Sequence, residues 1–166
     1  MIFGVSVQTF TIVHVIISFV AILSGIVAMI GMLASRRLGG WTALFLLTTV
    51  LTSVTGFMFP ITGFTPALGT GIASLVVLAI ALVAIYGRKL TGPWRWIYVV
   101  TGMIALWFNV LVLIVQAFQK IAFLHALAPT QSEPPFLIAQ GVALILFVVW
   151  AIAAAIRFHP ERVAIA

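Results

Sequence analysis

The chain has no cysteine and very few acidic residues. Its 166 residues include two acidic side chains, and only 6% of the residues are charged. Without cysteine there is no disulfide, no thiolate nucleophile and no cysteine-based metal site. The sequence also has no paired carboxylates for glycosidase chemistry, no HExxH pattern of a metalloprotease, no P-loop and no GxGxxG fingerprint. These absences favour a protein that is not an enzyme.

Apolar residues take the place of the missing charges. Hydrophobic residues make up 64% of the chain, whereas a soluble globular domain has about 25% charged residues. So few charges could not cover a surface in water, so we expect the lipid bilayer to be the solvent for most of the chain. The net charge of +6 comes from short basic groups between apolar runs. That pattern is typical of membrane topology signals and not of a nucleic-acid-binding face, so we expect no nucleic acid partner.

Five apolar runs are long enough to cross a membrane, which takes about 20 residues. We therefore predict an all-α integral membrane bundle of five transmembrane helices, a single domain over residues 1–166. The first run lacks the basic flank and the cleavage site of a signal peptide, so we expect a retained helix. The predicted spans are residues 7–34, 41–59, 67–86, 96–119 and 136–156, with an outer loop at 120–135.

The basic residues predict the orientation of the bundle. With five spans, seven of the eight lysines and arginines fall on one side of the membrane, and the other side receives only Lys120, together with Glu133. Basic loops face the cytoplasm, so the N-terminus is predicted outside and the C-terminus inside. Six of the inner basic residues are predicted to anchor this topology and to contact lipid headgroups: Arg36, Arg37, Arg88, Lys89, Arg95 and Arg157.

A polar stripe runs along the fourth span in the segment WFNVLVLIVQAFQK (107–120). At 100° per residue, Asn109, Gln116 and Lys120 fall within about 40° of one another. Polar and ionisable groups inside a membrane indicate a functional site. The alternative is that the amides only join helices and that the hydroxyls bond their own backbone. The predicted ligand pocket, in the outer half of the bundle, consists of His14, Thr55, Asn109, Gln116, Lys120 and Gln140.

The outer loop, AFQKIAFLHALAPTQSEPPF (117–136), carries the two opposite charges of that side. We predict that Lys120 and Glu133 pair across the mouth of the pocket. The FLHAL portion is predicted to form a short interfacial helix, and Pro134 and Pro135 suit the first turn of the last span. The alternative is an ordered connector without a binding role.

His14 is the residue whose chemistry is most specific. Its ordinary pKa near 6.5 suits proton transfer, and a neutral imidazole can bind a metal or haem. Haem would take a second axial ligand, and His125 in the outer loop is the only other histidine on that side. Haem or quinone is therefore a cofactor hypothesis, whereas no cluster of ligands predicts a metal-ion site.

Three segments carry a resemblance to known sequences: LTSVTGFMFP (51–60), WRWIYVVTGMIALWFNVLVLIVQAFQK (94–120) and LAPTQSEPPFLIAQ (127–140). They resemble a family of small bacterial multi-pass inner-membrane proteins of uncharacterised function. The resemblance covers most of the chain and implies a location in a bacterial inner membrane. It implies no activity, ligand or site residue.

Three functional hypotheses follow. The first is a membrane protein whose outer polar pocket binds a small ligand, a lipid or a partner. The second is an electron- or proton-transfer accessory protein that binds haem or quinone through His14. The third is a small oligomeric channel or transporter, which the lack of acidic groups and broken helices in the spans disfavours. The expected partners are the lipid bilayer and either a second copy of the chain or another membrane protein.

Overall fold

Five long helices and one short helix form the structure. The computed structural model describes residues 4–60, 63 and 65–160. The five predicted spans are confirmed as helices long and apolar enough to cross a membrane, and α2 ends at Gly56, three residues before its predicted end. The helices are α1 (Val7–Leu33), α2 (Gly39–Gly56), α3 (Pro66–Leu82), α4 (Trp94–Lys120), α5 (Ala122–Leu127) and α6 (Pro134–Arg157).

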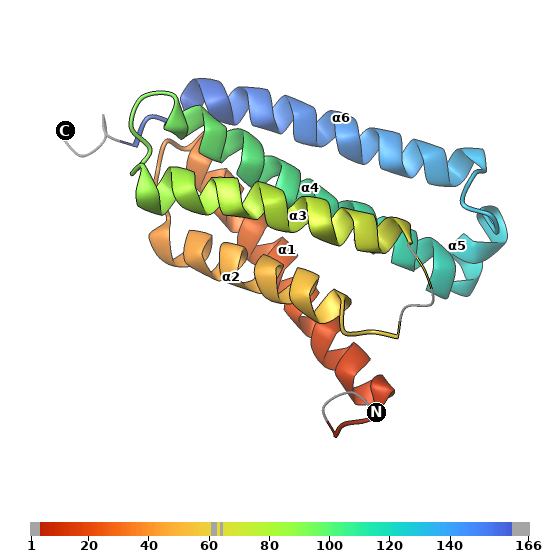
Figure 1. Cartoon of the computed structure of the whole chain (residues 1–166). Coiled ribbons are helices and arrows are strands. Elements are labelled where there is room, and N and C mark those ends of the chain that lie inside the picture. The colour runs from red at the N-terminus through yellow and green to blue at the C-terminus, as the bar shows by residue number, and fades with distance from the viewer. Residues whose placement is uncertain (1–3, 61–62, 64, 161–166) are drawn as a thin grey trace.

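Successive long helices run in opposite directions, so the connections alternate between two ends (Figure 1). One end holds the links at residues 34–38 and 88–93 and the last residue of α6, Arg157, and we call it the basic end. The other holds the start of α1, the link between α2 and α3, and the short helix α5, and we call it the α5 end. This alternation separates Lys120 from the predicted topology anchors.

Helix α4 lies at the centre of the bundle. It packs against α3 on one side and α6 on the other, and α1 crosses both α2 and α4 (Figure 1). Helix α6 packs mainly on α4 and leaves most of its surface open. Its exposed side chains are aliphatic, as expected of a surface that faces lipid: Ile138, Ile145, Val149, Ile152 and Ile156.

Local signals set the helix boundaries. The Ser6 hydroxyl accepts the Thr9 amide at 3.0 Å and caps α1, and the Thr65 hydroxyl caps α3 by accepting the Leu68 amide at 3.2 Å. Pro66 and Pro134 occupy first helical positions, where a missing N–H costs nothing. One feature has no sequence signal that we recognised: α3 continues into one turn of π-helix, Val83–Gly87.

At the basic end, the residues that follow α6 pack against α4 and the end of α1. Phe158 is buried against the Tyr98 ring, with centroids 6.2 Å apart. The Arg95 guanidinium donates to the Phe158 carbonyl, and the His159 amide donates to the Ser35 hydroxyl at 2.8 Å. These contacts join α6 to α1 and α4. Arg95, predicted as a topology anchor, therefore also holds the chain beyond α6.

The middle of the bundle depends on one small residue, Gly25 in α1. A Cβ atom built at Gly25 would lie 2.6 Å from Leu106 Cδ1 of α4 and 2.8 Å from Phe45 Cδ2 of α2. Small residues allow membrane helices to approach closely and to gain van der Waals contact. Ala21 and Ala28 are buried on the same side of α1. Gly25 therefore sets the distance of α1 from its two neighbours.

We predict that Gly25→Ala lowers the stability of the purified protein by about 1–3 kcal/mol, because the added methyl overpacks a three-helix contact. The matched control is Gly102→Ala in α4, where the nearest atom to an added Cβ is Met32 Cε at 3.9 Å, an ordinary contact. Thermal unfolding in detergent measures both variants. Equal melting temperatures for the two variants would contradict the assignment of Gly25.

Candidate functional site

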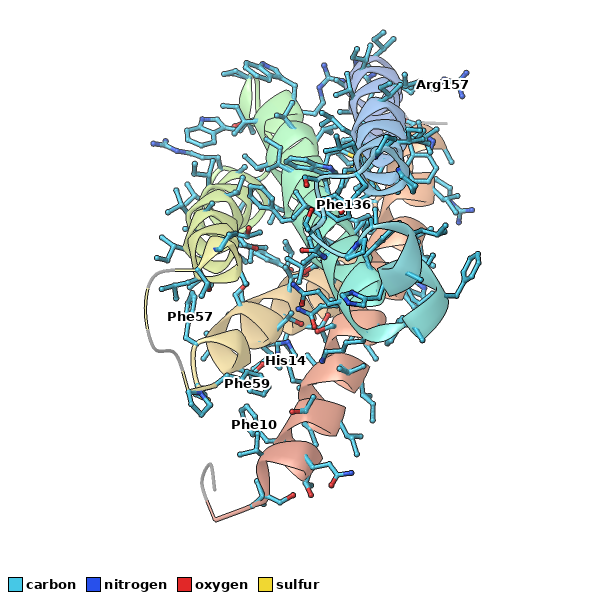
Figure 2. The ribbon with its side chains drawn as sticks, turned by 90° about the vertical axis from the view of Figure 1, so that its right-hand side faces the viewer. Phe10, His14, Phe57, Phe59, Phe136 and Arg157 are labelled. Atoms are coloured by element: carbon cyan, nitrogen blue, oxygen red, sulfur yellow. The ribbon has the colours of Figure 1, made fainter. Side chains whose placement is uncertain are left out.

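A histidine and a threonine meet where α1 crosses the end of α2. His14 Nδ1 lies 2.7 Å from Thr55 Oγ1. A Cβ at the next residue, Gly56, would lie 3.7 Å from His14 Cε1, so one edge of the ring rests against α2. Figure 2, which views the α5 end, shows His14 at this junction beside Phe59. The structure therefore brings together two of the predicted pocket residues.

The hydrogen bonds of Thr55 favour one tautomer of His14. The Thr55 hydroxyl donates its one proton to the Leu51 carbonyl at 2.7 Å, with a longer contact to the Thr52 carbonyl at 3.2 Å. Carbonyl oxygens only accept, so both short contacts of Thr55 can be hydrogen bonds only if Thr55 accepts from His14. In the neutral ring Nδ1 then carries the proton and Nε2 carries the free lone pair. Nε2 has no partner among the described residues and is not one of their buried polar atoms.

The polar stripe of α4 faces α2 at Asn109. The Asn109 side-chain amide donates to Thr49 Oγ1 of α2 at 3.1 Å. Gln116 and Lys120 share the face of Asn109, two and three turns nearer the α5 end. Lys120 is exposed at the α5 end of this face. Asn109 thus joins helices, and Gln116 and Lys120 continue the same face of α4 toward the α5 end.

Gln116 lies at about the same depth as Thr55. From the Asn109–Thr49 contact, Thr55 is six residues and Gln116 seven residues further toward the α5 end on helices that run in the same direction. At 1.5 Å per residue these advances are about 9 and 10 Å. About one turn before Thr55, Thr52 of α2 has a buried hydroxyl with no hydrogen-bond partner in the described structure. A buried orphan hydroxyl is uncommon and calls for an explanation.

Gln140 does not join this group. Its side-chain amide donates to the Leu111 carbonyl of α4 at 3.2 Å, and its Oε1 is buried without a partner among the described residues. Leu111 follows Asn109 by two positions, which is about 200° around α4. Since Asn109 faces α2, Gln140 lies on the far side of α4, where α6 packs. The predicted single pocket is therefore divided by α4.

Aromatic rings surround the junction of α1 and α2. The Phe59 ring meets the His14 ring edge-on at 5.3 Å and the Phe10 ring at 5.2 Å (Figure 2). Such edge-to-face geometry is the favourable one for aromatic pairs. The rings give His14 an apolar wall on the side that faces away from the bundle centre.

The outer loop is tied to α4 by a residue that sequence reasoning missed. Gln131 donates to the Val115 carbonyl at 2.8 Å, and its Oε1 accepts from Gln119 at 3.3 Å. Its backbone is left-handed, with φ of 59°. The polar TQSE segment marks a structured loop, but no local pattern specifies a partner sixteen residues away. The short helix α5 is present, and its Phe123 is exposed.

The Glu133 carboxylate accepts hydrogen bonds from its own loop and does not pair with Lys120. Its carboxylate accepts from the Thr130 hydroxyl at 2.9 Å, the Thr130 amide at 3.2 Å and the Ser132 amide at 3.1 Å. Desolvation raises the pKa of the Glu133 carboxyl, but these donors outweigh it and hold the pKa below the ordinary value of 4.5. The predicted pair with Lys120 is not formed in the described structure, because nearer donors take the carboxylate.

His125, the other predicted haem ligand, is exposed on α5. The haem hypothesis thus has one histidine of the required tautomer, His14, and a second on the exposed surface. Among the described residues, no group of three or more His, Cys, Asp and Glu side chains could hold a metal ion.

No family model, curated protein or solved structure matches this chain.

We predict that Asn109 and Thr49 are energetically coupled across α2 and α4. A double-mutant cycle with Asn109→Leu and Thr49→Val should give about 0.6 kcal/mol, and at most about 1.7 kcal/mol, the range for hydrogen bonds between membrane helices. The control cycle replaces Thr49 by Thr48, whose hydroxyl donates to its own Leu44 carbonyl at 2.7 Å. Equal coupling in both cycles would contradict the pairing.

We predict that the amide signals of Thr130 and Ser132 titrate with Glu133, at a midpoint below pH 4.5. Because the folded pKa is lowered, the contribution of Glu133 to loop stability is complete above pH 4.5 and is lost as the pH falls through the folded pKa. NMR spectra recorded between neutral and acidic pH measure the midpoint. In Glu133→Gln the two signals should not titrate, and a wild-type midpoint at or above 4.5 would overturn the assignment.

Proposed function

We propose that this chain is a non-catalytic, multi-pass protein of the bacterial inner membrane that binds a small ligand near the α5 end of its bundle. In this orientation the α5 end faces outward, as the positive-inside rule requires when the basic end faces the cytoplasm. The binding groups are His14, Gln116 and Lys120, with Thr52 and Thr55 beside them.

The observation that carries the proposal is the free acceptor on His14. Thr55 uses its own proton on the α2 backbone and so holds Nδ1–H, which leaves Nε2 unpartnered among the described residues. Fixing one ring nitrogen so that the other can bind is the usual arrangement of ligand-binding histidines. Packing alone would not need it, because a histidine that only joins two helices needs one bond.

A second observation is the orphan hydroxyl of Thr52, which is buried next to this pair. Threonines in membrane helices commonly donate to the carbonyl four residues earlier, as Thr55 and Thr48 do here. A ligand between α1, α2 and α4 would give the Thr52 hydroxyl a partner. Asn109, in contrast, is satisfied by Thr49 and contributes to the site as support.

We predict that a bacterial polar lipid extract raises the melting temperature of the detergent-purified protein. At a hundredfold excess over the dissociation constant, binding adds about 2.7 kcal/mol, which for this chain length corresponds to about 5–10 °C. The double variant His14→Leu/Gln116→Leu should lose most of the increase, because it removes two binding groups.

The matched control is Gln140→Leu, which removes an amide on the other side of α4 and should keep the full increase. If the double variant and the control respond equally to the extract, the lipids act on the surface of the whole bundle and the proposed site is wrong.

A further inference from the structure

The chemistry of the site narrows the ligand class, provided that the proposed function holds. Two groups define what the ligand must offer: the lone pair on His14 Nε2 and the charge on Lys120. They lie on α1 and α4, which pack against each other. Each group can be considered separately before they are combined.

The Nε2 atom of His14 can bind only a hydrogen-bond donor of the ligand. Since Thr55 holds the proton on Nδ1, Nε2 of the neutral ring can only accept. A ligand that offers only carbonyl or ester oxygens would face a lone pair with another lone pair. The group at Nε2 is therefore an O–H or an N–H.

The positive charge of Lys120 favours an anionic group on the ligand. Its natural partner on this end of the bundle, Glu133, is engaged by Thr130 and Ser132. The second acidic residue of the sequence, Glu161, follows α6 and lies outside the described residues. Lys120 therefore has no counter-ion among the described residues. It lies one turn beyond Gln116, which is at about the depth of the His14–Thr55 bond. A cationic donor such as an ammonium is thus disfavoured at Nε2, which leaves a hydroxyl.

The depth of the site indicates where such a group is found. Helix α2 has 18 residues and spans about 27 Å, close to the thickness of the hydrocarbon core of about 30 Å. Thr55 lies one residue before the end of α2. Its bond with His14 therefore lies at the boundary between acyl chains and headgroups, and Lys120 lies one turn further out than Gln116.

We infer that the ligand is an anionic headgroup with a free hydroxyl, of the glycerol phosphate type, whose phosphate contacts Lys120 and whose hydroxyl donates to His14 Nε2. Gln116, one turn below Lys120 on the same face, can bond the phosphate or the glycerol oxygens. The Thr52 hydroxyl can bond a second glycerol oxygen. A phosphatidylglycerol lipid offers this combination at this depth, and free glycerol phosphate offers the same chemistry from water.

The test is native mass spectrometry of the protein released from nanodiscs. The discs contain equal amounts of phosphatidylglycerol, phosphatidylmethanol and phosphatidylethanolamine with identical acyl chains. Phosphatidylmethanol has the same single phosphodiester charge as phosphatidylglycerol but no hydroxyl. Wild type should retain phosphatidylglycerol about fivefold over phosphatidylmethanol, because one neutral hydrogen bond distinguishes the two. It should retain phosphatidylglycerol about fivefold over phosphatidylethanolamine, because a lysine near the surface favours an anion by about that factor.

Two variants separate the two interactions. Thr55→Val frees Nδ1 from its acceptor, so the ring no longer holds Nε2 as an acceptor, and the preference for phosphatidylglycerol over phosphatidylmethanol should fall to about one. The control Thr48→Val removes an α2 hydroxyl that bonds only its own helix and should keep the preference. Lys120→Gln should lose the preference over phosphatidylethanolamine, whereas Lys89→Gln at the basic end should not.

Each result decides the matter. If Thr55→Val keeps the wild-type preference, the hydroxyl assignment is overturned. If Thr55→Val changes retention but Lys120→Gln does not, the ligand is a neutral hydroxyl donor such as a quinol, and the anionic class is overturned.

Displacement of retained lipid by soluble glycerol 3-phosphate would assign the headgroup site to the free compound. Equal retention of all three lipids, still lost in His14→Leu/Gln116→Leu, contradicts this inference but not the proposed function. Retention that no site variant changes contradicts both.

Discussion

The close contact of α1 with α2 and α4 at Gly25 sets the position of the hydrogen bond between His14 and Thr55. Helices α1 and α2 run in opposite directions from the point where Gly25 meets Phe45. Eleven residues back along α1 is His14, and ten residues forward along α2 is Thr55, so both advance by about 15 Å and meet. A bulkier residue at Gly25 would tilt or separate the helices, and the His14–Thr55 bond would open first because it lies furthest from the contact.

This geometry gives neighbouring threonines of α2 different roles. Thr49 faces α4 and accepts from Asn109, whereas Thr55 faces α1 and accepts from His14. Thr52 lies between these directions, and its hydroxyl is buried without a partner among the described residues. Lipid offers no hydrogen bonds, so an orphan group at this depth is costly. Thr49 and Thr55 therefore join α2 to its neighbouring helices. The Thr52 hydroxyl has no such partner and is available to hydrogen-bond a ligand.

Much of the fold could be predicted from the sequence, because apolar run length and 3.6-residue periodicity are local properties. The five spans and the stripe of Asn109, Gln116 and Lys120 depend on these alone.

The contacts between residues of different helices are not a local property of the sequence. Depth along a helix placed Gln140 with His14, but depth does not say on which side of α4 a residue lies. The charges of Lys120 and Glu133 suggested an ion pair, yet three donors within four residues of Glu133 hydrogen-bond to its carboxylate. Gln131 was missed because its contact depends on a left-handed loop backbone.

The central claim is that Thr55 holds His14 with its proton on Nδ1, and NMR of protein labelled with ¹⁵N at histidine measures this directly. The chain has three histidines, so the His14 signals can be assigned by their loss in His14→Gln. At a pH where His14 is neutral, the account predicts a protonated Nδ1 and an unprotonated Nε2, and a shift of the proton toward Nε2 in Thr55→Val. A wild-type spectrum with the proton on Nε2, unchanged in Thr55→Val, would contradict it.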